Sequence, residues 1–159
     1  MKQDKLWLIL PLLLVTASLF YFTFNPSYER SLHAKFYYAM GDYPSAYSMA
    51  KEAFELDPYN RMAATVMTQS QTALKFVDYI DQAKKYSEKI ALIAASESIT
   101  SGDKAKMKLM CEVMMESFVK ISPIDRDGRK VVLDKALLDE ARNYYEQFVA
   151  LHEKITQTL

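Results

Sequence analysis

Side chains able to do catalytic chemistry are few in this chain, which has one cysteine and two histidines among 159 residues. Cys111, His33 and His152 are too sparse to indicate a nucleophile–base pair, and the sequence has no glycine-rich phosphate loop. His152 and Glu153 begin like a zinc-protease motif, but Thr156 stands where the second histidine is required. The sequence therefore predicts a protein that is not an enzyme and has no cofactor, no metal and no small-molecule substrate.

A segment between the last two expected helices has acidic side chains of the kind that bind calcium. Asp125, Asp127 and Gly128 in the stretch SPIDRDGRK resemble part of a calcium-binding loop. Pro123 stands where the first ligand would be, and Lys130 stands where the chain normally turns apolar. An ordinary Asp-Gly turn is therefore the favoured interpretation.

Methionines and the single cysteine share one face of a helix that the pattern predicts over residues 103–121. The face comprises Met107, Met110, Cys111, Met114, Phe118 and Ile121. Such a face can form a core, an adaptable docking site or a thioether metal site, and the last normally needs exposed methionines with histidine or cysteine. A core stripe is the favoured interpretation, and a membrane-bound enzyme or metal protein built on this face is one functional alternative.

Charge and composition exclude some functions and indicate a helical fold. Twenty Lys and Arg side chains balance twenty Asp and Glu side chains. No basic stripe with interleaved aromatic residues is present, so nucleic-acid binding is not expected. The sequence holds only three glycines and five prolines and is rich in helix-forming residues, which predicts an all-α protein. The single cysteine allows no intramolecular disulfide.

The segment over residues 6–24 is uncharged and apolar, and it is about as long as a helix that crosses a membrane. Trp7 and Tyr21 fall near its two ends, where aromatic side chains favour the membrane interface. Lys2 and Lys5 precede the segment, and the positive-inside rule places them in the cytoplasm.

The apolar segment divides the chain into three parts. We expect a cytoplasmic tail at 1–5, a transmembrane signal anchor at 6–24 and a periplasmic helical domain at 25–159. A cleaved signal peptide, with small residues at 15–17 before the cleavage point, is the alternative. The short basic tail, the single span and the lack of a cysteine framework or glycosylation acceptor fit a single-pass protein of a bacterial inner membrane.

Small and large residues follow one another in a distinctive order within a helical hairpin expected at 26–58. Small side chains let paired helices approach closely, Gly41 suits the end of the first helix, and Pro44 and Pro58 suit the first turns of the next two. The ordered positions are Ala34, Tyr37, Gly41, Asp42, Tyr43, Ala46, Ala50, Ala53, Leu56, Asp57 and Pro58. The larger side chains expected to fill space are Phe36, Tyr37, Met40 and Phe54. Together, over Tyr28–Pro58, these residues resemble one tetratricopeptide repeat.

The resemblance implies that the first helix lines a groove that binds a protein partner. The groove positions would be Tyr28, Ser31, Lys35, Tyr38 and Ala39. Ser31 and Lys35 stand where family members that clamp a terminal carboxylate have a lysine and an asparagine, so binding of chaperone C-termini is not implied. For Tyr28 and Tyr38, contact with the following long helix or with membrane headgroups is an equally weighted alternative.

Three further helical segments are expected after the repeat. Neither glycine nor proline occurs between Asn60 and Thr100, so residues 58–99 are predicted to form one long helix or a bent pair. Asp78 and Tyr79 in this segment would repeat Asp42 and Tyr43 if a degenerate second repeat formed. A final helix over 132–158 has an apolar seam formed by Leu137, Ala141, Tyr144, Phe148, Leu151 and Ile155. Since stable arrays need about three repeats, the later helices are expected to cover the single one.

These observations favour a non-enzymatic, membrane-anchored scaffold or adaptor that binds other proteins of a bacterial envelope assembly. A flagellar motor or a secretion machine is the kind of host expected. The alternative is a periplasmic, chaperone-like accessory of protein translocation. A scaffold should have one stoichiometric partner, whereas a chaperone should bind many unfolded clients.

Overall fold

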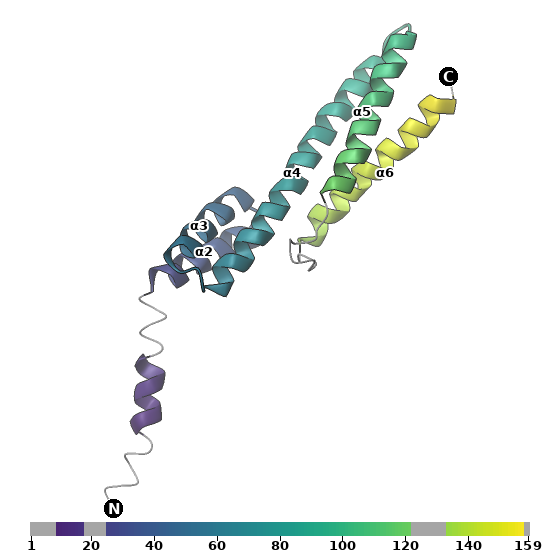
Figure 1. Ribbon diagram of the computed structural model, residues 1–159. Coiled ribbons are helices and arrows are strands. Elements are labelled where there is room, and N and C mark those ends of the chain that lie inside the picture. The colour runs from purple at the N-terminus through teal and green to yellow at the C-terminus, as the bar shows by residue number, and fades with distance from the viewer. Residues whose placement is uncertain (1–8, 18–24, 122–132, 158–159) are drawn as a thin grey trace, which may run out of the picture. The chain divides into compact units, whose positions relative to one another are not determined.

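The computed structural model describes residues 9–17, 25–121 and 133–157, and the regular secondary structure in these ranges is helical (Figure 1). Residues 9–17 are helical, and the later helices are α2 (Pro26–Ala39), α3 (Tyr43–Leu56), α4 (Arg61–Ala94), α5 (Ser101–Lys120) and α6 (Lys135–Gln157). No strand occurs within these ranges. The described part therefore confirms the predicted all-α class.

Three sequence-based predictions fall wholly or partly outside the described residues. The predicted membrane span at 6–24 is described only over 9–17, which is helical with exposed side chains. None of the helices in the described ranges has both the length and the apolar character needed to cross a membrane. The segment with Asp125, Asp127 and Gly128 lies outside the described residues, as do both ends of the helix predicted at 132–158.

The chain divides into two compact units, Met1–Ser70 and Gln71–Leu159, although the sequence predicted one domain over 25–159. The boundary lies within α4, so the first part of this helix belongs to one unit and the rest to the other. Each unit has its own apolar core.

Capping side chains set the helix ends in the first unit. Asn25 caps α2 by accepting a hydrogen bond from the Ser27 N–H at 3.0 Å, and Pro26 occupies the first helical position. After α2, Gly41 has a φ of 80°, which a side chain at this position would oppose. Asp42 then caps α3 by accepting from the Ser45 N–H at 3.2 Å. The expected glycine turn and the proline at the start of α3 are thus present.

Small side chains form the contact between α2 and α3, which lie side by side in Figure 1. Ala34 of α2 and Ala46, Ala50 and Ala53 of α3 are fully buried. Val66 of α4 joins the same core, and the partly buried residues packed around it are Tyr37, Tyr38, Met49, Met62 and Met67. Because alanine side chains are small, the backbones of the two helices can approach closely at these positions, as the sequence pattern predicts.

Two details of this hairpin differ from the prediction. Phe36 and Met40 do not fill space between the helices, because both are exposed. The third helix begins at Arg61 rather than at Pro58, since Pro58 and Tyr59 form a turn. In that turn the Asp57 carboxylate accepts a hydrogen bond from the Tyr59 N–H at 2.9 Å. The helix starts only after Asn60, whose side chain caps it.

The second unit packs the later part of α4 with α5 and α6. Thr100 and Asp103 form a reciprocal capping box that starts α5, so this helix begins at Ser101 rather than at the predicted residue 103. α4 continues unbroken through Asp78 and Tyr79, so no second hairpin turn forms there. The core residues are Phe76, Tyr79, Ile80, Ala83, Ile90, Met107, Cys111, Met114, Ala141, Phe148 and Ile155.

The methionine face of α5 and the seam of α6 both belong to this core. Met107, Cys111 and Met114 are buried, and Met110, Phe118 and Ile121 pack against them. The remaining seam residues Leu137, Tyr144 and Leu151 pack against the same core. The core interpretation of the methionine face is therefore confirmed, and the α6 seam packs within the same unit. Burial, with a smaller contribution from Glu112, raises the pKa of the Cys111 thiol to about 11, so the thiol stays protonated and unreactive near neutral pH.

Candidate partner-binding surfaces

A buried polar junction fixes the beginning of α2 against the end of α3 and the beginning of α4. The Asn60 side-chain amide donates to the Ser27 hydroxyl at 2.8 Å and to the Ser31 hydroxyl at 3.2 Å. Ser27 in turn donates to the Ala53 carbonyl at 2.8 Å. The three side chains are essentially inaccessible to solvent. Because each buried polar group here has a partner, the junction holds the three helix ends together at little desolvation cost.

Asn60 has a second role as the cap of α4. Its side-chain oxygen accepts hydrogen bonds from the Met62 N–H at 3.1 Å and the Ala63 N–H at 3.2 Å. One side chain thus provides hydrogen-bond partners for backbone N–H groups in the first turn of α4 and for two hydroxyls of α2. Asn60 is not among the residues predicted from the sequence, although an asparagine directly after an Asp-Pro-Tyr turn is a recognisable helix cap.

The structure separates the five predicted groove residues. Ser31 is fully buried and donates to the Tyr28 carbonyl at 2.9 Å, so it is not available to a partner. Tyr28 and Tyr38 are partly buried, and the Tyr38 ring packs edge-on against Tyr43 with ring centres 5.4 Å apart. Lys35 and Ala39 are exposed. Only this last pair lies fully on an open face of α2.

An exposed apolar stripe lies beside that pair on α2. Leu32, Phe36 and Met40 are 57%, 62% and 68% exposed, and their spacing of four residues places them on one side of the helix. The buried residues Ser27, Ser31 and Ala34 lie on the opposite side. We call the exposed set the α2 surface, defined by Leu32, Lys35, Phe36, Ala39 and Met40.

The α2 surface has the composition of a protein contact region. Three large apolar side chains form its centre, while Lys35 lies on one edge and Glu29 and His33 on the other. An ion pair between Arg30 and Glu52 joins α2 to α3 at one flank of this region. A contiguous exposed stripe, unlike isolated exposed residues, typically marks an interaction site.

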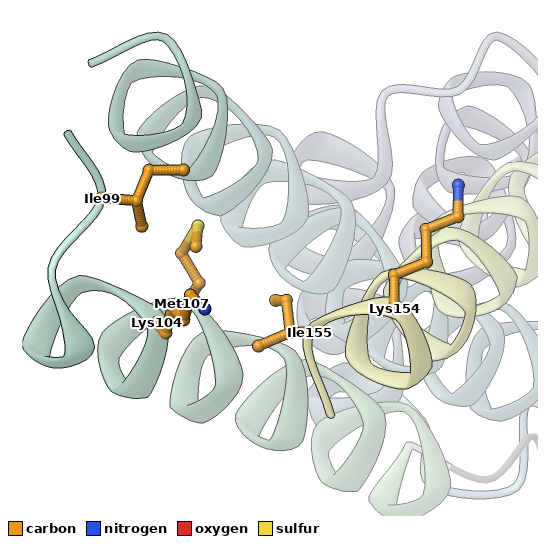
Figure 2. A pocket seen from close by; sticks show the side chains of 5 residues that line it. All are labelled: Ile99, Lys104, Met107, Lys154 and Ile155. Carbon is orange, nitrogen blue, oxygen red and sulfur yellow. The ribbon is translucent and has the colours of Figure 1, made fainter. Parts of the chain in front are cut away.

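Hollows border α6 among the described residues of the second unit, and two of them differ in size. The smaller has a volume of about 180 Å³ and is lined by Ile99, Lys104, Met107, Lys154 and Ile155 (Figure 2). The larger has a volume of about 410 Å³ and lies between α4 and α6, lined by Ser87, Ile90, Ala91, Gln147, Phe148, Ala150, Leu151 and Lys154. Both are mainly apolar, and both have Lys154 at the edge.

Polar contacts also join the helices of this unit. The Lys84 ammonium of α4 lies 3.1 Å from the Glu140 carboxylate of α6. The His152 side chain of α6 lies 3.3 Å from the Glu112 carboxylate of α5, so this histidine takes part in a polar contact between the two helices. Across the described residues, no group of three or more His, Cys, Asp or Glu side chains is arranged to hold a metal ion.

Comparison with known proteins adds no family to this geometry. A scan against protein-family models, a search of curated proteins and a search of solved structures each find no match.

Proposed function

We propose that the protein is a membrane-anchored helical scaffold that binds another protein through the α2 surface. The observation that carries this proposal is the apolar stripe formed by Leu32, Phe36 and Met40 on a helix whose other side is tightly packed. Burying three such side chains against a partner would supply most of the favourable free energy of a small interface. The rigid support beneath the stripe limits the entropy lost on binding.

The resemblance to a tetratricopeptide repeat supports the same proposal. The alanines that carry the resemblance are the fully buried residues of the α2–α3 contact, and Gly41 adopts the left-handed conformation at the turn. Repeats of this family bind proteins through the first helix of each hairpin. In this chain α2 is that helix, and its open side is the α2 surface.

The proposed location rests on the sequence. The uncharged segment at 6–24 and the lysines before it favour a single span with the helical units on the periplasmic side. Pro26 starts α2 directly after this segment, so a partner bound to the α2 surface would lie close to the membrane. Such a position suits an adaptor in an envelope assembly, such as a flagellar motor or a secretion machine.

Site-specific photocrosslinking in the native host tests this proposal. A photoreactive aromatic amino acid placed at Phe36 should yield one dominant, stoichiometric adduct, identified by mass spectrometry. The same probe at Leu109, an equally exposed apolar residue of α5, is the control and should not yield that adduct. Phe36→Asp should abolish copurification of the partner, while Leu109→Asp should not. Equal adducts from both positions would contradict the proposal.

The chaperone-like alternative predicts a different result in the same experiment. An apolar stripe can also hold unfolded clients, because it offers contact area without a specific shape. Crosslinks from Phe36 would then spread over many envelope proteins and increase when secretion is overloaded. A single partner in fixed proportion would exclude this alternative.

A further inference from the structure

The smaller hollow at α5 and α6 combines an apolar floor with a cationic edge. Met107 and Ile155 form the floor and are almost fully buried, while Ile99 supplies a partly exposed wall. Figure 2 shows Ile99, Met107 and Ile155 facing a common space, with Lys104 beside Met107 and Lys154 extending outward from α6. None of the five lining residues is acidic.

The volume of the hollow limits what can occupy it. Sites for cofactors and drug-sized ligands typically measure about 300–1,000 Å³. This hollow, at about 180 Å³, is smaller and suits a single apolar side chain. A protein partner can supply such a side chain as an anchor residue, whereas a lipid chain would extend well beyond the space.

The positive charges at the edge of the hollow favour acidic residues on either side of the apolar anchor residue. Lys104 and Lys154 lie on different helices, so carboxylates on either side of one anchor residue can each approach a lysine. The carboxylate of Asp103, which precedes Lys104 on α5, accepts a hydrogen bond from the Thr100 hydroxyl at 2.7 Å and lies 3.9 Å from the Lys106 ammonium, and the Thr100 hydrogen bond lowers the pKa of Asp103. Both lysines also have other interactions, so a bound carboxylate would add to those or exchange with them.

We propose that this hollow is a second docking site, which accepts one apolar side chain from an acidic segment of a partner protein. Met107, Ile155 and Ile99 contact the apolar anchor, and Lys104 and Lys154 bind the flanking carboxylates. The site lies in the second unit and is independent of the α2 surface. The protein would then have two contact regions, one on each unit, as an adaptor requires.

Fluorescence anisotropy with the full-length chain in mild detergent tests the site. The probes are short labelled peptides of glutamate and aspartate around one central residue, either leucine, phenylalanine, methionine or serine. At least one apolar peptide should bind, and the serine peptide should bind roughly tenfold more weakly because it cannot fill the hollow. Affinity should also fall as salt increases.

Charge-reversal variants connect the binding to the two lysines. Lys104→Glu and Lys154→Glu should each weaken binding of the apolar peptide by about tenfold. Lys106→Glu makes the same change on α5 at a residue that does not line the hollow, and it should stay within about twofold of the parent chain. Phe36→Asp should leave peptide binding unchanged. Thermal melts that match the parent chain would show that these surface variants remain folded.

Three results would overturn the proposal. The first is no binding of any apolar acidic peptide at millimolar concentration. The second is an equal loss of affinity in Lys106→Glu and Lys104→Glu, which would indicate a response to net charge alone. The third is displacement of a fluorescent fatty acid by oleate, sensitive to Lys104→Glu, in a chain that binds no peptide; the hollow would then be a lipid site.

Discussion

At the scale of single residues, Asn60 is the side chain on which the first unit most depends. Asn60→Ala removes a helix cap and two buried hydrogen bonds to Ser27 and Ser31, so we expect a loss of roughly 2–3 kcal/mol in the free energy of unfolding. Asp42→Ala removes only an exposed cap of α3 and should cost about 1 kcal/mol. Urea denaturation of both variants measures the difference. Equal losses would show that the buried junction contributes nothing beyond capping.

Cys111 makes the stability of the second unit depend on pH in the alkaline range. Its pKa rises from 9.0 to about 11 on burial, so the unfolded chain loses this proton at a lower pH than the folded chain. The contribution is complete below pH 9 and is lost as pH rises toward 11, by an amount on the order of 2 kcal/mol. Cys111→Ala should therefore flatten the decline in unfolding free energy over this range.

The readout of the Cys111 experiment is the slope against pH rather than the absolute stability, because the alanine also leaves a small cavity. Burial and Tyr145 raise the pKa of Tyr79 to about 12, so a decline above pH 10 should remain in the variant. An unchanged slope between pH 9 and 10 in Cys111→Ala would contradict the assignment.

At the scale of helices, the contact between α2 and α3 depends on small side chains that let the backbones meet. Ala46→Leu adds bulk to a fully buried position and should force the helices apart, with a cost of about 1–3 kcal/mol. Ala39→Leu makes the same change at an exposed position of α2 and should stay within about 0.5 kcal/mol of the parent chain. Thermal melting compares the two. An Ala46→Leu variant as stable as the Ala39→Leu variant would show that this contact is loose.

The helices themselves could be predicted from the sequence, but the sides they bury were only partly predictable. Proline and glycine positions indicate the hairpin, since Gly41 and Pro44 act through the local backbone. The alanine pattern predicts the buried position of Ala34 correctly, but Phe36 and Met40, which were expected to fill space beside it, are exposed. The informative signal is the row of small residues Ser27, Ser31 and Ala34. Two helices can approach closely only where the side chains between them are small, whether or not these side chains are hydrophobic.

At the scale of the whole molecule, the division into two units could not be read from the sequence. α4 has apolar residues at helical spacing along its length, but Val66 joins one core while Phe76 and Ile90 join another. Periodicity indicates which side of a helix is buried and does not indicate which neighbour buries it. For the same reason the hollow beside Ile155 was missed, because it arises where three segments meet.

The orientation of the chain in a membrane is the prediction that concerns the whole molecule. A reporter enzyme that is active only outside the cytoplasm can be fused after the second unit. It should be active, because Lys2 and Lys5 keep the N-terminal tail at 1–5 in the cytoplasm and the chain beyond the 6–24 segment is then outside. Replacing both lysines with glutamate should reduce reporter activity, since the charge bias that orients the 6–24 segment is then lost. As a control, replacing Lys51 and Lys75 with glutamate makes the same change in net charge farther along the chain. This variant should leave the reporter active. A silent reporter in the unmodified chain, with the fusion intact on immunoblots, would place both proposed contact regions in the cytoplasm.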